Sequence, residues 1–160
     1  MFIMNGDGTN LTPLDSEVGG DYDPEWSPDG LKIAFTSLRT DNIPKICVMY
    51  LWDYTVQILA AEGSKNMQPA WSPDGKQIVY VSEAAEGWEL YKINADGSRA
   101  TRLSQSGAIN KRPAWTPDGR RIVFEREGNI YSMNVDGSEV INLTKHFGGG
   151  ISSACFCSVR

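Results

Sequence analysis

One five-residue motif occurs three times in this chain at an almost constant spacing. The copies begin at Trp26, Trp71 and Trp115, which lie 45 and 44 residues apart, and each continues with Ser or Thr and then Pro-Asp-Gly. An internal repeat of this length indicates a chain built from similar structural units that stack on one another. The residues expected to be structural in the three copies are Trp26, Pro28, Asp29, Gly30, Trp71, Pro73, Asp74, Gly75, Trp115, Pro117, Asp118 and Gly119.

The residues around each motif predict two hairpins per repeat. Proline fixes a backbone angle needed in a tight turn and glycine accepts a positive φ, so Pro-Asp-Gly predicts a turn between two strands. Alternating apolar residues such as Ile33 and Phe35 predict the strand that follows. Later in the repeat, Asn-x-Asp-Gly ending at Gly97 or Gly137 predicts a second hairpin. Four antiparallel strands in a period of about 40–45 residues are typical of a propeller blade, so the predicted class is all-β.

The complete pattern resembles the TolB-type propeller repeat, a relative of the WD repeat. It consists of Pro-x-Trp-Ser-Pro-Asp-Gly, Ile-x-Phe, Ile-Tyr-x-x-Asn-x-Asp-Gly and Leu-Thr, and it covers nearly the whole chain. Families with such propellers include the periplasmic TolB proteins and the tricorn-type and prolyl-oligopeptidase-type peptidases. The resemblance implies a ring of four-stranded blades, and it implies no single activity.

We expect one propeller unit over residues 1–160, with split blades at its two ends. Residues 1–14 match only the second half of the repeat and predict a half blade. Residues 150–160 align with its beginning but lack the Trp and the turn residues, so they predict the degenerate start of a further blade. The whole blades are predicted at residues 21–62, 66–106 and 110–145.

The split ends predict how the ring closes. The C-terminal strand would join the N-terminal strands of the same chain, which gives four blades, or those of a second copy, which gives eight. We expect the homodimer, because four strongly twisted sheets leave little room at the axis. A piece of a longer propeller is the third interpretation, since terminal repeats normally carry a closing device.

Composition and charge exclude few functions but argue against two. The net charge is −5, and a basic surface of the kind that binds nucleic acid is not expected. The sequence has no long apolar run that would predict a membrane span. The opening Met1–Met4 is too short for a signal peptide, so the location stays open, and it would be periplasmic if the TolB resemblance extends that far.

Residues that could carry out chemistry are scarce. The one histidine, His146, lies in a Gly-rich stretch and is expected to be a solvated loop residue. Cys155 and Cys157 are too close in sequence for the usual zinc knuckle. We therefore predict no catalytic residues, no metal site and no cofactor.

Polar residues at equivalent positions of the three blades form the one candidate site. Asp21, Asn66 and Asn110 stand three residues before each blade's Pro, and the resemblance places them at the mouth of the central channel. Their oxygen atoms could hold a cation or a polar ligand there. The resemblance implies that the channel itself is lined by Asp23, Gln68 and Arg112.

The sequence thus favours a non-catalytic propeller that binds a protein partner or acts as a scaffold. The partner is not identified. Two alternatives stay open: the propeller of a tricorn-like or prolyl-oligopeptidase-like peptidase, which needs a separate hydrolase domain, and a sensor that binds a ligand or cation.

Overall fold

The structure is a computed structural model that describes residues 1–14, 20–60 and 65–146. Within these ranges all regular structure is β-strand, which confirms the predicted all-β class. The same ranges contain no helix that could cross a membrane. The further blade predicted at residues 150–160 lies outside the described residues.

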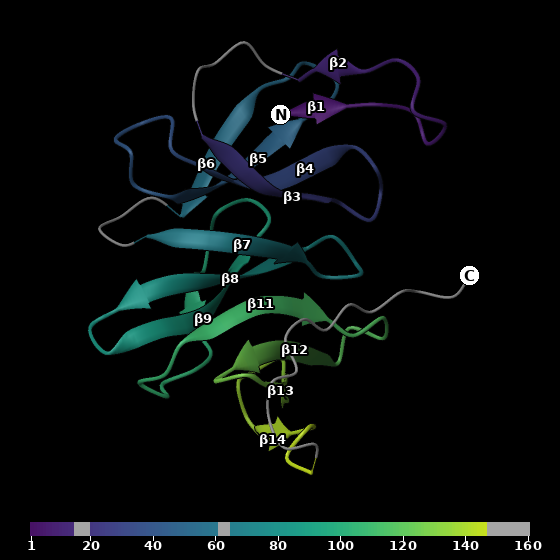
Figure 1. Ribbon diagram of the computed structural model, residues 1–160. Coiled ribbons are helices and arrows are strands. Elements are labelled where there is room, and N and C mark those ends of the chain that lie inside the picture. Colours follow the sequence, from purple (N-terminus) through teal and green to yellow (C-terminus); the bar gives the residue numbers. More distant parts are fainter. Residues whose placement is uncertain (15–19, 61–64, 147–160) are drawn as a thin grey trace.

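Three four-stranded antiparallel sheets follow a two-stranded one along the chain, and they lie one beneath another in Figure 1. The two-stranded sheet, here called the half blade, consists of β1 (Phe2–Ile3) and β2 (Thr12–Pro13). Blade 1 contains β3 (Asp21–Trp26), β4 (Lys32–Ser37), β5 (Lys45–Tyr50) and β6 (Val56–Ala60). Blade 2 contains β7 (Asn66–Trp71), β8 (Gln77–Ala84), β9 (Gly87–Asn94) and β10 (Thr101–Arg102). Blade 3 contains β11 (Asn110–Trp115), β12 (Arg121–Arg126), β13 (Asn129–Asn134) and β14 (Ile141–Asn142).

The repeated motif forms the same turn in each blade because its side chains satisfy the turn's backbone. In blade 1 the Asp29 carboxylate accepts hydrogen bonds from the Ser27 hydroxyl at 2.6 Å and from the Leu31 N–H at 3.0 Å. The Ser27 hydroxyl oxygen in turn accepts the Lys32 N–H at 2.9 Å. Gly30 has φ of 71°, as the turn requires. The same bonds recur around Ser72 and Thr116, so the motif defines the hairpin between the first two strands.

The first strand of each blade carries a β-bulge at the same place. The pairing of β3 with β4 shifts between Tyr22 and Glu25, and β7 and β11 shift at the equivalent positions. The proline inside each bulge has no N–H to donate, which suits a break in the ladder. The residue before it has a positive φ: 52° at Asp23, 57° at Gln68 and 49° at Arg112.

The core is divided into three clusters, each lying between two consecutive sheets. Trp71, on β7, packs with Ala34, Ile46 and Val48 of blade 1 and is only 4% exposed. Trp115, on β11, packs against blade 2 and donates from its Nε1 to the carbonyl of Ala70 at 3.1 Å. Each repeated tryptophan of these two blades therefore attaches its own blade to the one before it.

The first interface departs from this pattern. Trp26 is 49% exposed, because only the two strands of the half blade precede it in the described chain. The third cluster is smaller and consists of Leu14 from the half blade packed on Ile33, Phe35, Cys47 and Met49 of blade 1.

Candidate functional site

The three residues predicted at the channel mouth are at least partly buried in the structure. Each begins the first strand of its blade, as β3, β7 and β11 start at Asp21, Asn66 and Asn110. The Asp21 carboxylate accepts hydrogen bonds from the Ser37 hydroxyl at 2.7 Å and from Arg39, with which it also forms an ion pair. Asn66 and Asn110 are 4% and 0% exposed. Binding of a cation at these positions stays a prediction, and it would require these side chains to exchange their partners.

Asn110 belongs to a buried network around Glu89, which the sequence analysis missed. The Asn110 amide donates to the carbonyl of Trp88 at 2.7 Å and to Glu89 at 3.1 Å, and its oxygen accepts from Arg126 at 2.8 Å. The backbone N–H groups of Ser106 and Gly107 also donate to Glu89, at 2.8 and 2.9 Å. Burial raises the pKa of Glu89, but hydrogen bonds from Ser104, Gly107 and Ser106 and the charge of Arg102 outweigh it and leave the pKa below its usual value. A charged residue between Trp88 and Leu90 in a strand was the available signal for this network.

The three residues predicted to line the channel lie around a common depression, and their place in a central channel stays a prediction. Asp23, Gln68 and Arg112 line a shallow cavity of about 340 Å³ together with the prolines that follow them. They are linked across the blades, because the Arg112 N–H donates to Gln68 Oε1 at 2.8 Å and the Gln68 N–H donates to Thr36 Oγ1 at 3.1 Å. We call the surface formed by Asp23, Glu25, Gln68 and Arg112 the channel wall.

Glu25 is the channel-wall residue that sequence reasoning missed. It occupies the position held by Ala70 and Ala114 in the other blades, so the comparison of repeats contained a signal. Its carboxylate accepts the backbone N–H of Trp71 at 3.3 Å and thereby bridges blades 1 and 2. Burial raises the pKa of Glu25 to about 7, although the Trp71 N–H acts in the opposite direction.

The channel wall contains both acidic and basic side chains. Burial raises the pKa of the Asp23 carboxyl, with Arg112 acting to lower it. Arg112 also pairs with Glu125 at 2.8 Å. Among the residues of the described ranges there is no cluster of three or more His, Cys, Asp or Glu side chains that could hold a metal ion. His146 is exposed at the end of those ranges.

Comparison with known proteins agrees with the fold described above. A profile of the TolB beta propeller domain matches residues 1–157. The crystal structure of TolB from Acinetobacter baumannii aligns with 94% of this chain and 38% of its own, with 26% identity and a TM-score of 0.81. A putative TolB from Agrobacterium tumefaciens aligns with 88% of this chain and 55% of its own, with 22% identity and a TM-score of 0.82. The chain thus spans roughly two fifths to just over half of the length of these two proteins.

Propellers with other activities share the fold at lower identity. The tricorn protease aligns with 88% of this chain and 14% of its own, with 18% identity and a TM-score of 0.65. A search of curated proteins by sequence finds no significant match. The predicted propeller of four-stranded blades and the predicted resemblance are both confirmed, and this chain belongs to the family of the TolB beta propeller domain.

Proposed function

We propose that this chain is a non-catalytic binding module that presents its channel wall to a protein partner. The observation that carries the proposal is that Asp23, Gln68 and Arg112 line one shallow cavity, each with a positive φ at the β-bulge of its blade. Such a conformation costs about 1–3 kcal/mol per residue and is concentrated at functional sites. Its recurrence in three blades directs one polar residue per blade into the same shallow cavity.

The charges of the channel wall indicate the chemistry of the partner. Desolvation raises the pKa of both Asp23 and Glu25, which means that their ionised forms lack sufficient compensation by cations. A lysine or arginine side chain brought in by a partner would supply it. We therefore propose a protein segment with exposed basic residues as the partner.

The test is a selection of displayed peptides on the wild-type chain, with a counter-selection on the double variant Asp23→Asn, Glu25→Gln. The expected result is enrichment of peptides rich in Lys and Arg that bind the wild type and lose at least tenfold in affinity on the double variant. Glu86→Gln, which neutralises an exposed carboxylate outside the wall, serves as the matched control. Peptides that bind the wild type and the double variant equally well would contradict the proposal.

We also propose that two copies of the chain form the closed ring that presents this wall. The support is the half blade, which supplies two strands of a four-stranded unit. Light scattering over a series of concentrations should give a stable mass near twice 17.6 kDa. A monodisperse monomer would exclude the two-copy ring, and a mass that keeps rising with concentration would indicate open association instead.

A further inference from the structure

We propose that a polar cavity in blade 2 binds a small zwitterion of the amino-acid type, with the ligand's carboxylate at Arg102 and its ammonium group at Glu86. The cavity has a volume of about 430 Å³ and lies between the β8–β9 hairpin and the loop from β10 to β11. The hairpin lies at the left of Figure 1. None of the residues that line the cavity belongs to the channel wall, so this inference goes beyond the proposed function.

The cavity is formed by features that the other two whole blades lack. β8 and β9 contain eight residues each, whereas their counterparts β4, β5, β12 and β13 contain six. Arg102 is also specific to blade 2, because Ile58 and Asn142 occupy its position in the other blades. The elements around the cavity lie well inside the described chain, in blade 2 and in its connection to blade 3. The cavity therefore does not result from an incomplete blade at either end.

A close contact between the hairpin and the loop forms the cavity before any ligand arrives. The Trp88 N–H donates to the Ala108 carbonyl at 3.1 Å. Gly87 allows this approach, because a Cβ there would lie only 2.6 Å from the same carbonyl oxygen. The loop is also held from inside the blade, since Gly107 donates its backbone N–H to the buried Glu89 at 2.9 Å. A preformed site loses little freedom on binding, which favours affinity for a small ligand.

Arg102 lines the cavity with part of its guanidinium group already fixed. Its Nε donates to the Ser104 carbonyl at 2.7 Å, and its Nη2 lies 3.4 Å from Glu89 Oε1. Glu89 is satisfied mainly by shorter hydrogen bonds from the loop and from Asn110. In the described part of the chain Nη1 has no acceptor, and the Arg102 side chain is 38% exposed. Nη1 and the outer N–H of Nη2 therefore form a fork of the kind that pairs with a carboxylate.

Glu86 brings the opposite charge from the tip of the hairpin. Its carboxylate lies beside the loop, where a Cβ on Gly107 would be 3.5 Å from Glu86 Oε2. Within residues 65–146 Glu86 and Arg102 form no ion pair with each other, although both line the cavity. A lone anion would be repelled by Glu86 and a lone cation by Arg102, whereas a ligand with both charges satisfies the two side chains at once. The Gln105 amide and the Ser106 hydroxyl complete a lining suited to a small polar ligand.

The test uses the full 160-residue chain and three zwitterions that differ in the separation of their charges: glycine, β-alanine and 4-aminobutanoate. Their binding is followed by the NMR shifts of the Gly87 and Gly107 amides. We expect at least one of the three to bind saturably, and at least tenfold more tightly than acetate or methylammonium, which carry one charge each. Arg102→Gln should weaken the binding of that zwitterion at least tenfold. Arg120→Gln, which removes an exposed arginine outside the cavity, should bind it as the wild type does.

The variant Glu86→Gln gives a second signature that a change in folding would not produce. It should weaken the zwitterion at least tenfold and strengthen acetate, because the repelling carboxylate is gone while Arg102 remains. Glu86 is exposed, so this variant keeps the test decisive if Arg102→Gln, which also loses the contact with Glu89, does not fold. Saturable binding by none of the three zwitterions overturns the proposal, as does equal binding of a zwitterion and either single-charge probe. The variant Asp23→Asn, Glu25→Gln should bind the zwitterion as the wild type does, which separates this proposal from that of the channel wall.

Discussion

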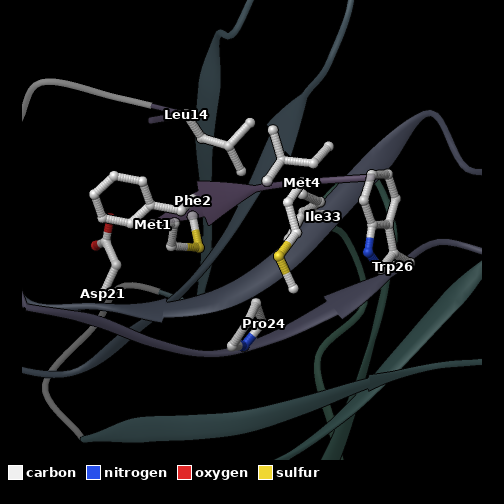
Figure 2. Close-up of a pocket in the computed structure, with 9 residues that line it drawn as sticks. Met1, Phe2, Met4, Leu14, Asp21, Pro24, Trp26 and Ile33 are labelled. Atoms are coloured by element: carbon white, nitrogen blue, oxygen red, sulfur yellow. The ribbon is translucent and has the colours of Figure 1, made fainter. Parts of the chain in front are cut away.

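The interface between blades 1 and 2 and the interface between the half blade and blade 1 use the same residue types with different results. In the former, a complete sheet covers Trp71, and the backbone N–H of Trp71 donates to the side chain of Glu25. In the latter, the equivalent Trp26 lies half exposed beside a cavity (Figure 2). The comparison teaches that the repeated tryptophan is fully buried only where a complete four-stranded blade precedes it.

The leucines that end each repeat show a similar difference, and here the exposed residue is the one in blade 3. Each repeat ends in a leucine, and Leu14, Leu59 and Leu103 are buried against the blade that follows. Leu143 ends blade 3 and is 47% exposed. One face of each blade therefore depends on its predecessor and the other on its successor.

The largest expected effect is the difference in stability loss between a substitution of Trp71 and one of Trp26. Trp71→Ala removes a fully packed side chain and should lower the free energy of unfolding by about 3–5 kcal/mol. Trp26→Ala should lower it by less than about 1 kcal/mol, because half of the ring already contacts water. Denaturant unfolding of the two variants checks the difference. Equal losses would mean that the first interface is as well packed as the second.

The leucines provide a second, smaller contrast. Leu103→Ala should cost about 2–3 kcal/mol, since this side chain fills the cluster between blades 2 and 3. Leu143→Ala removes a side chain that is half exposed and should cost less than about 1 kcal/mol. Thermal unfolding followed by tryptophan fluorescence would show the two shifts. The contrast would be lost if Leu143→Ala lowered the melting temperature as much as Leu103→Ala.

Substitutions at two glycines test whether the Asn-x-Asp-Gly turns also contact the preceding blade. Gly8 and Gly137 have nearly the same φ, 84° and 89°, so a substitution by alanine strains both backbones alike. A Cβ at Gly137 would lie 2.3 Å from the carbonyl oxygen of Leu103, while a Cβ at Gly8 meets nothing within 4 Å. Gly137→Ala should therefore destabilise the chain by about 1–3 kcal/mol more than Gly8→Ala. A chemical-denaturation midpoint that is the same for both would show that blades 2 and 3 are not in contact there.

The smallest predicted effect is a pH dependence of stability that arises from Glu25, which accepts the backbone N–H of Trp71 between blades 1 and 2. Because the folded pKa of Glu25, about 7, lies above the ordinary value of 4.5, the folded chain holds this proton more tightly than the unfolded chain. Its contribution to stability is thus greatest below pH 4.5 and decreases as the pH rises towards 7. With partial exposure taken into account, the loss between pH 5 and pH 8 should be about 1–2 kcal/mol.

The variant Glu25→Gln isolates that contribution, because the amide oxygen can still accept the Trp71 N–H. Its stability should fall less than that of the wild type between pH 5 and pH 8. Asp23, whose pKa is also raised, supplies a further decrease in the same direction that the variant retains. If the wild type and the variant followed parallel curves, the raised pKa of Glu25 would be refuted.

Sequence reasoning predicted the features of the fold that depend on local chemistry. The Trp-Ser-Pro-Asp-Gly turn could be predicted because Ser27 and Asp29 satisfy a backbone within five residues of themselves. The alternation at Ile33 and Phe35 likewise depends on the period of a strand.

The features that it missed depend on neighbouring blades or on unusual backbone angles. The residue before a proline is normally extended, so a positive φ at Gln68 could not be foreseen. The pKa of Glu25 depends on burial by blade 2, and Asn110 meets Glu89 from 21 residues away. The exposure of Trp26 follows from the strands that accompany it, which its own motif does not encode.

The contact between successive turns has a consequence for how such a chain can be made and enlarged. A Cβ on Gly75 would lie 3.8 Å from Pro28, and one on Gly119 would lie 3.8 Å from Pro73, so each motif rests on the motif before it. A blade leaving the ribosome then finds its complete docking surface already present on the growing protein, and folding can proceed in the order of synthesis. Gene duplication of one repeat would likewise insert a blade whose two faces match both of its new neighbours.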